Sequence, residues 1–426
     1  MNTSKWWLGQ AGRLCLATAL ATCAVQAGRM SVASWWAHKD TADGFRKAER
    51  WDSSNPDYAV GLGRALMSEE MEGDQRGSVL AFERAVALGP MRAENWASLG
   101  EARASAADPL VATLAFRRAL DLFPKSPAIN WEFANFLIRR GELEGASIPL
   151  ALALAGDPAL REGVFDLAWR AGMMPAKILK ILPGQPETAS AYLDYLVSTG
   201  RLDAAGAVWR GLVESSYPID LGAAFRYFDG LLAARQADLM VGVWTDLARH
   251  ERMRMPLPPT GEERIIDGGF EQAPLGGGFD WRMVPVDGAA MSFDPSMAHG
   301  GERSLAIRFD GQHNLDFTHV TQYVPVMSDT AYRFAAYART EEITSDSGLR
   351  IAVYDAFDRQ ALSLETPNLA GTSGWQQQQL AFRTGPETKI LIVQVVRHPS
   401  RKLDNRISGT VWLDDFSLVP MALANH

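Results

Sequence analysis

The stretch from Trp96 to Pro124, WASLGEARASAADPLVATLAFRRALDLFP, decides the fold of the middle of this chain. Its apolar and small residues recur at spacings of three and four, which places each group on one face of an α-helix. The two groups are Trp96, Leu99 and Gly100, and then Ala112, Phe116 and Ala119, with Pro124 closing the unit. The small Gly100 and Ala112 allow two helices to approach closely, so the stretch predicts a packed helix pair.

Prolines repeat around this unit at Pro90, Pro124 and Pro158, which are 34 residues apart. A repeat of that length is typical of a helical solenoid. The pattern resembles tetratricopeptide repeats over about residues 45–252, with looser units on both sides of the clear one and a shortened one at 161–183. The resemblance implies a scaffold or adaptor, because stacked helix pairs present a groove that suits a peptide or a helix of a protein partner.

The first forty residues are interpreted as an export segment. An apolar run at 14–27 follows basic residues, and no acidic residue precedes Asp40. This pattern is typical of a signal peptide cleaved near Ala27. Because apolar residues resume afterwards, an uncleaved membrane anchor over 14–37 is the alternative. Both alternatives place the body of the chain in the periplasm or cell envelope, with membrane contact only through this segment.

Charge and cysteine content exclude other classes of protein. The net charge is −8, which argues against a nucleic-acid binder, since such a protein needs a basic surface. The only two cysteines, Cys15 and Cys23, lie in the export segment. The rest of the chain therefore has neither a cysteine nucleophile nor a CxxC redox motif.

A Pro-rich linker is expected at 253–264, and the periodicity changes after it from helical to alternating. The stretch SLAIRF at 304–309 places every second residue on one face, as in a half-buried β-strand. Further strands are predicted at 332–337, 349–354, 379–382 and 390–396. Strands recurring at short intervals predict an antiparallel β-sandwich or barrel.

Six motifs of this half occur in the order found in one family of domains. They are DGGFE at 267–271, GGERSL at 300–305, QYVPV at 322–326, YRFAAYART at 332–340, GW at 374–375 and VWLDDFSL at 411–418. Together they resemble carbohydrate-binding modules of the galactose-binding-like jelly-roll type over residues 265–420. The resemblance implies a jelly-roll sandwich that opens with the first motif as a strand and binds a polysaccharide.

Aromatic and planar polar side chains are the candidates for contact with a glycan. They are Trp281, His313, Asn314, Gln322, Tyr354, Arg397, Arg401 and Asn405. The segment 397–406 is unusually polar and basic, so it either contacts an anionic glycan or is tied to its own scaffold. Trp375 and Trp412 are expected in the core.

The same resemblance implies one structural calcium ion and no other cofactor. Acids of the first and last strands hold such an ion in the resembling modules, and Glu271 and Asp415 occupy those positions, with Asp267 and Asp414 as neighbours. The alternative is that these carboxylates are solvated or paired with basic residues.

The sequence favours a non-catalytic protein. The GxSxG, HExxH and P-loop motifs are absent, and adjacent strand residues such as Asp414 and Asp415 are expected to point to opposite faces. The combined prediction is an export or anchor helix, a tetratricopeptide-type α-solenoid and an antiparallel jelly-roll sandwich. It would be an envelope scaffold in exopolysaccharide production or export. The alternatives are an assembly adaptor that binds no sugar and a carbohydrate-active enzyme.

Overall fold

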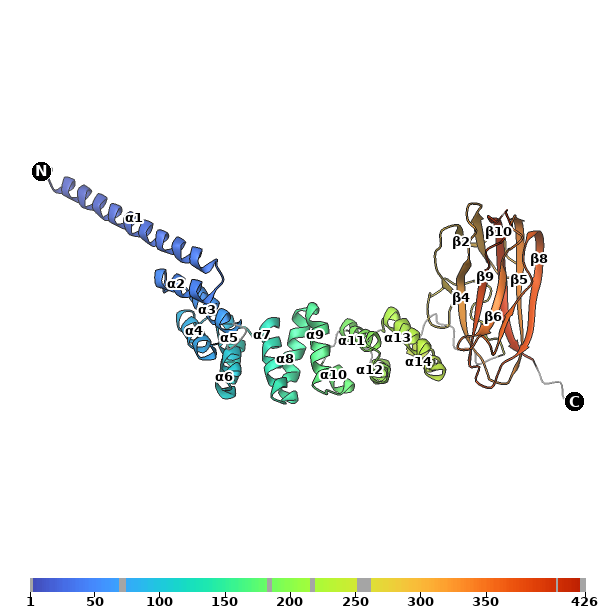
Figure 1. Ribbon diagram of the computed structural model, residues 1–426, viewed down its shortest axis with the longest axis horizontal. Helices are drawn as coiled ribbons and strands as arrows, with labels where there is room; N and C mark the ends of the chain where they lie inside the picture. The colour runs from blue at the N-terminus through green and yellow to red at the C-terminus, as the bar shows by residue number, and fades with distance from the viewer. Residues whose placement is uncertain are drawn as a thin grey trace. The chain divides into compact units, whose positions relative to one another are not determined.

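A computed structural model shows a helical region followed by a β-sandwich, as the periodicities predict (Figure 1). It describes residues 3–68, 74–181, 186–214, 219–250, 262–403 and 405–421. Contacts divide the chain into two compact units, Met1–Thr188 and Ala189–His426. This boundary differs from the predicted one, because the last helices group with the sandwich. Most of the predicted 253–264 linker, residues 253–261, lies outside the described residues.

The first unit consists of helices that pack mainly against their neighbours in the chain. They are α1 (Thr3–Ala37), α2 (Ala42–Trp51), α3 (Pro56–Ser68), α4 (Gln75–Leu88), α5 (Ala93–Ser105), α6 (Pro109–Leu122), α7 (Pro127–Arg139), α8 (Leu143–Gly156), α9 (Arg161–Arg170) and α10 (Pro175–Ile181), with a 3-10 turn at Pro158–Leu160. The short α9 and α10 confirm the shortened unit. Among the described residues, no helix is both long enough and apolar enough to cross a membrane.

The small residues of the 34-residue pattern allow the two helices of a pair to pack closely. In the pair α5–α6, Leu99, Ala112, Phe116 and Ala119 are buried. A side chain on Gly100 would come within 2.9 Å of the Phe116 ring, so only glycine allows this approach. A second recurring feature, an asparagine near the start of a helix, was not predicted from the sequence. Asn95 and Asn130, each near the start of a helix, donate Nδ2 hydrogen bonds to carbonyls of the preceding turn.

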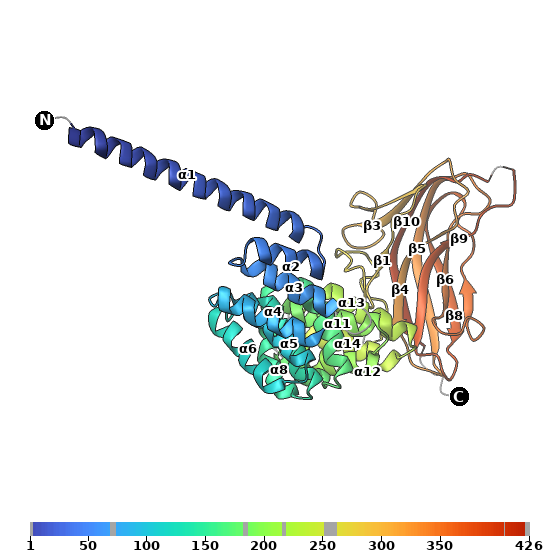
Figure 2. The same ribbon diagram turned by 60° about the vertical axis from the view of Figure 1, so that its left-hand side comes forward.

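The second unit combines helices with two five-stranded antiparallel sheets (Figure 2). Its helices are α11 (Pro186–Ser198), which crosses the unit boundary, α12 (Leu202–Glu214), α13 (Leu221–Ala233) and α14 (Ala237–His250). Its strands are β1 (Arg282–Met283), β2 (Ala289–Asp294), β3 (Ser304–Asp310), β4 (Phe317–Pro325), β5 (Ala331–Ile343), β6 (Arg350–Asp355), β7 (Ser363–Glu365), β8 (Gly371–Arg383), β9 (Ile390–Arg397) and β10 (Ser408–Pro420).

The sheets have the strand orders β1-β4-β9-β6-β7 and β2-β3-β10-β5-β8. Alternate residues face inward, and the resulting core includes Leu305, Ile307 and Phe309 of the predicted SLAIRF strand. All five strands predicted from periodicity are therefore present. The predicted opening strand at 267–271 is wrong: it is a turn, in which Asp267 and Phe270 have φ of 45° and 57°. Such left-handed backbone does not continue a strand.

A loop of the sandwich packs on the last two helices within the second unit. Phe279 is fully buried, with its ring centroid 4.8 Å from that of Phe228 on α13 and 5.8 Å from that of Trp244 on α14. Arg282 Nη2 lies 2.7 Å from Asp229 Oδ1, and Lys389 Nζ lies 2.6 Å from Asp238 Oδ2. The contact therefore combines an aromatic centre with two ion pairs at its edge.

Candidate ligand-binding face

The outer face of the sheet β1-β4-β9-β6-β7 carries two tyrosines in one row, Tyr323 half-buried and Tyr354 buried beneath Arg359. Tyr323 of β4 and Tyr354 of β6 are each paired with Ile392 of β9, so the three side chains share a face. Two interstrand spacings separate the tyrosines, roughly 10 Å, which is the span of about two linked sugar rings. We call Thr321, Tyr323, Tyr354, Ile392 and Gln394 the tyrosine face.

An amide in the next row is held between two strands. Gln394 is paired with Thr321 on one side and with Ala352 on the other. Its Nε2 donates to Thr321 Oγ1 at 3.0 Å, and its Oε1 accepts a hydrogen bond from the Tyr354 hydroxyl at 2.9 Å. Burial raises the pKa of Tyr354, so this hydroxyl stays protonated and donates at neutral pH. The amide is thus fixed beside the tyrosine row.

The floor of the tyrosine face is an apolar cluster separate from the main core. Ala352, Tyr354 and Val396 are buried there, and Ile392 packs against them. This cluster holds the Tyr354 ring in place, because packed side chains have few alternative rotamers. A rigid aromatic row beside a fixed amide is suited to a flat, polar ligand such as a sugar.

Guanidinium groups cover the two tyrosine rings. Arg359 lies over the Tyr354 ring, 4.0 Å from its centroid, and Arg282 lies 5.0 Å from the centroid of Tyr323. Arg359 is exposed, whereas Arg282 is paired with Asp229. Because a guanidinium binds carboxylates through two parallel hydrogen bonds, the arrangement favours an anionic ligand.

Arg397, a predicted glycan contact, is fully buried. Its guanidinium donates to the carbonyls of Ser347, Leu315 and Asn405, and to the side chains of Asn314 and Ser345. All three of its nitrogens bond acceptors of the protein and the side chain is fully buried, so a ligand at the surface does not reach it. This corrects the expectation for Arg397 and favours the alternative, in which its segment is tied to its own scaffold.

The neighbours of Arg397 are part of the same support. Asn314 accepts a hydrogen bond from Ser400 N at 2.9 Å and donates one to Ser400 O at 2.9 Å. Asn405 contributes the carbonyl that Arg397 binds. The Asn314 side chain therefore holds a loop, whereas only the backbone of Asn405 takes part in this support, so its half-buried side chain stays a candidate contact. Arg401, in contrast, is exposed and stays a candidate contact.

Trp281 and Gln322 are fully buried, which excludes them from a binding surface. The Trp281 indole donates to Asp267 O at 3.0 Å, and the Gln322 amide accepts from Ile266 N and donates to Ile266 O. Both side chains hold the turn that replaces the predicted opening strand.

The remaining aromatic and histidine candidates lie elsewhere. His313 pairs with Asp310 at 2.9 Å. Trp412 is buried, as expected, and donates to Asp294 Oδ2 at 2.9 Å. Trp375 is only half-buried and contacts His299, so its placement in the core is wrong.

The candidate calcium ligands lie around one loop, and the protein's own donors use them. Glu271 Oε1 accepts from Glu302 N at 2.9 Å, and Asp415 Oδ2 lies 2.6 Å from His299 Nδ1. In the described part of the chain, no group of three His, Cys, Asp or Glu side chains is placed to hold a metal ion. The residues as placed do not form a calcium site, and the ion stays a prediction.

Asp414 and Asp415 reach the same loop, contrary to the expectation that they face apart. The pairing of β10 with β5 shifts register between Asp414 and Ser417, and Asp415 has φ of 48°. Asp414 is fully buried and accepts from the backbone N–H of His299 and Gly300, while burial raises its pKa. Because of this bulge, Asp414 and Asp415 do not point to opposite faces of the sheet as regular strand residues would.

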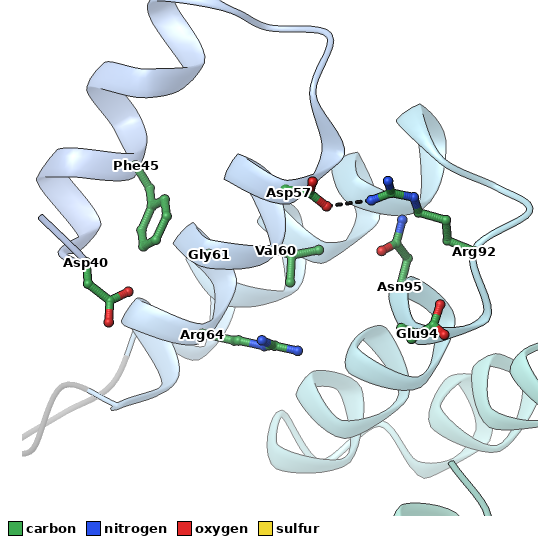
Figure 3. Close-up of a pocket in the computed structure, with 9 residues that line it drawn as sticks. All are labelled: Asp40, Phe45, Asp57, Val60, Gly61, Arg64, Arg92, Glu94 and Asn95. Carbon is green, nitrogen blue, oxygen red and sulfur yellow. Dashed lines mark hydrogen bonds and ion pairs between the residues drawn. The ribbon is translucent and has the colours of Figure 1, made fainter. Parts of the chain in front are cut away.

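A pocket of about 560 Å³ opens between the helices of the first unit (Figure 3). Its lining combines charged, polar and apolar side chains from α2, α3, α5 and the turn before α2. They are Asp40, Phe45, Asp57, Val60, Gly61, Arg64, Arg92, Glu94 and Asn95. Figure 3 shows Arg64 extending across the pocket from α3 toward α5, while Arg92 and Asp57 form an ion pair. This mixed lining suits a polypeptide segment.

Arg64 also belongs to a charged group that runs along the first helices of successive pairs. Burial raises the pKa of Glu132 on α7 to about 6; Glu101 on α5 adds to the rise and Arg64 opposes it. Charged side chains of three helices thus influence one another across this surface.

No family model matches the chain, and no curated protein matches it. Among solved structures it is similar to a family 16 carbohydrate-binding module, with 19% identity, covering 36% of this chain and 98% of that one, at a TM-score of 0.27. It is also similar to pilF of Pseudomonas aeruginosa, with 17% identity, 48% and 94% coverage and a TM-score of 0.27. A third similar structure is MamA, with 15% identity, 38% and 89% coverage and a TM-score of 0.29. TM-scores this low carry no conclusion about function, which depends on the side chains described above.

Sequence reasoning found Tyr354 but missed the rest of the tyrosine face. Tyr323 stands next to Gln322, and Gln394 and Ile392 lie within the predicted strand 390–396, for which the sequence indicated no ligand contact. A signal was present, because Tyr323 and Gln394 occupy the outward positions of strands whose inward positions are Val320, Val324, Val393 and Val395.

Proposed function

We propose that this chain is a non-catalytic scaffold of the cell envelope whose sandwich binds an anionic polysaccharide on the tyrosine face. The observation that carries the proposal is the row of Tyr323, Ile392 and Tyr354 on three adjacent strands, with Gln394 beside it and Arg359 above it. Aromatic rings contact the C–H faces of sugars, the amide bonds hydroxyl groups, and a guanidinium attracts carboxylates or sulfates.

The helical region supplies the second half of the proposed role. The pocket lined by Arg64, Asp57 and Glu94 would hold a segment of a protein partner. Export through residues 1–40, with cleavage near Ala27 or anchoring over 14–37, would place both sites outside the cytoplasm. Exopolysaccharide production or export is the setting that fits a protein holding both a polypeptide and a glycan.

Binding of the full chain to a panel of acidic and neutral bacterial polysaccharides tests the proposal. We expect the double variant Tyr323→Ala/Gln394→Ala to weaken binding of the best acidic ligand at least tenfold, and Arg359→Ala to weaken acidic ligands more than neutral ones. Gln236→Ala, at an exposed position in the turn before α14, should leave binding unchanged. Equal binding by all variants, or no binding across the panel, would contradict the proposal.

Repeating the binding with a chelator tests the calcium prediction separately. Loss of binding or a lower melting temperature after chelation, restored by Ca²⁺, would support a structural ion near Glu271 and Asp415. Unchanged binding and melting would exclude it.

An assembly adaptor without sugar binding is the second candidate. The observation that favours it is that Arg359 and Arg282 already cover both tyrosine rings. A chain that captures a protein partner through each unit, and no glycan, would select the adaptor.

A further inference from the structure

The strand β8 is an unusually long and uncharged sheet edge. It closes one side of the sheet β2-β3-β10-β5-β8 over 13 residues, Gly371–Arg383 (Figure 1). The other edge strands, β1, β2 and β7, have 2, 6 and 3 residues. Each of these short edges contains a charged residue: Arg282, Asp294 and Glu365, respectively. On β8 no charged residue precedes Arg383.

Proteins ordinarily protect sheet edges with short strands, charges, prolines or bulges, because the unpaired N–H and C=O groups bind further strands. In the described residues, the pairing of β8 with β5 is irregular only between Ala338 and Ile343. From Gln376 to Phe382 the register is continuous, and this part of the edge contains no charge, proline or bulge.

We propose that β8 pairs antiparallel with β8 of a second copy of this chain, joining two sandwiches through one continuous sheet. The centre of the strand is the run Gln376–Gln379. In a two-fold antiparallel pair, a symmetry axis beside Gln377 or Gln378 places glutamine opposite glutamine at the central positions. Each glutamine amide both donates and accepts, so identical edges are complementary without any charge.

The exposure of these side chains supports this assignment. Gln376, Gln377 and Gln379 are exposed, and Gln379 Nε2 already donates to Gln377 Oε1 along the strand. An acidic or basic partner strand would find no opposite charge here, whereas a second β8 meets its own pattern. The pairing lies on the other sheet from the tyrosine face, so it stands independently of the proposed function.

Light scattering after size exclusion tests the pairing, using the full chain in mild detergent over a range of concentrations. We expect a protein mass approaching twice 46.6 kDa for the unmodified chain. The double variant Gln377→Lys/Gln379→Lys should raise the dissociation constant at least tenfold, because lysines would lie close to lysines across the axis. The matched control Gln236→Lys/Gln312→Lys adds the same charge at exposed positions away from β8 and should remain dimeric.

Cross-linking identifies the register. In a chain with Cys15 and Cys23 replaced by serine, the variants Gln377→Cys and Gln378→Cys should include one that forms an intermolecular disulfide under mild oxidation. A monomeric unmodified chain would overturn the proposal. So would a dimer that the lysine pair leaves intact and neither cysteine cross-links, or a monomer whose β8 captures an extended segment of another polypeptide.

Discussion

Arg397 shows how a polar side chain at the end of a strand can serve stability instead of recognition. Its burial lowers the pKa of its guanidinium, yet five acceptors surround it. Arg397→Leu would leave buried carbonyls of Ser347 and Leu315 unpaired, at a cost of about 1–3 kcal/mol each. We expect a loss of roughly 3 kcal/mol or more in chemical denaturation. Arg401→Leu, at an exposed position, should change stability by less than about 0.5 kcal/mol.

Neighbouring residues explain what the sequence could and could not predict about the site. The sequence predicts Gln322 as a glycan contact, but Tyr323 is the residue that faces outward. A shift of one residue reverses the face of a side chain in a strand, and Gln322 occupies an inward position of β4 together with Val320 and Val324. Tyr354 could be predicted because its aromatic side chain is of the kind that contacts sugars. The burial of Arg397 could not be predicted, because its hydrogen-bond acceptors come from loops distant in sequence.

Glu132 gives the first unit a pH-dependent stability. Its pKa is about 6 in the folded chain, against 4.5 for an unperturbed glutamate, so folding disfavours its charged form. The penalty is absent below pH 4.5 and develops as the pH rises through about 6. Glu132→Gln should therefore raise the free energy of unfolding by about 1 kcal/mol at pH 7.5 and by almost nothing at pH 4.5. Urea denaturation at both values, with exposed Glu94→Gln as control, checks this; an equal effect at both would contradict it.

Alanine substitutions at two helical glycines distinguish the effect of packing on stability from the effect of helix propensity. A side chain on Gly100 of α5 would come within 2.9 Å of Phe116, whereas nothing lies within 4 Å of one on Gly242 of α14. Alanine improves helix propensity at both positions by about 0.5–1 kcal/mol. We expect Gly242→Ala to stabilise the chain by that amount and Gly100→Ala to destabilise it by about 1–3 kcal/mol, because the helices must separate. Thermal unfolding of both variants is the measurement, and a stabilising Gly100→Ala would contradict the packing argument.

At the scale of elements, periodic strands and helices were predictable, but strained turns were not. SLAIRF and the Trp96–Pro124 unit contain their own periodicity, and both elements formed as expected. The DGGFE turn depends on positive φ at Asp267 and Phe270, residues with no strong preference for it. Hydrogen bonds from Gln322 and Trp281 hold this region, and neither is near it in sequence. Tertiary contacts therefore override the local pattern there.

One glycine-rich loop connects the sandwich to helices of the second unit. Gly276–Gly278 forms a loop, and its glycines allow Phe279 to reach α13 and α14. A side chain on Gly277 would come within 2.3 Å of Phe225, and one on Gly278 within 2.2 Å of Trp244. This loop joins α13 and α14 to the sandwich, and the contacts group α12, α13 and α14 with the sandwich in the second unit.

Phe279→Ala should therefore affect both sides of this contact at once. Removing a fully buried phenylalanine costs about 3–5 kcal/mol in a packed site. We expect faster hydrogen exchange in α13 and α14 as well as around Arg282, with no change in α5 and α6. The matched variant Phe123→Ala removes a half-exposed phenylalanine from the first unit and should leave the second unit unaffected. If exchange rises only within the sandwich, the helices would be stable without the loop, and the boundary would return to the Pro-rich segment where the sequence placed it.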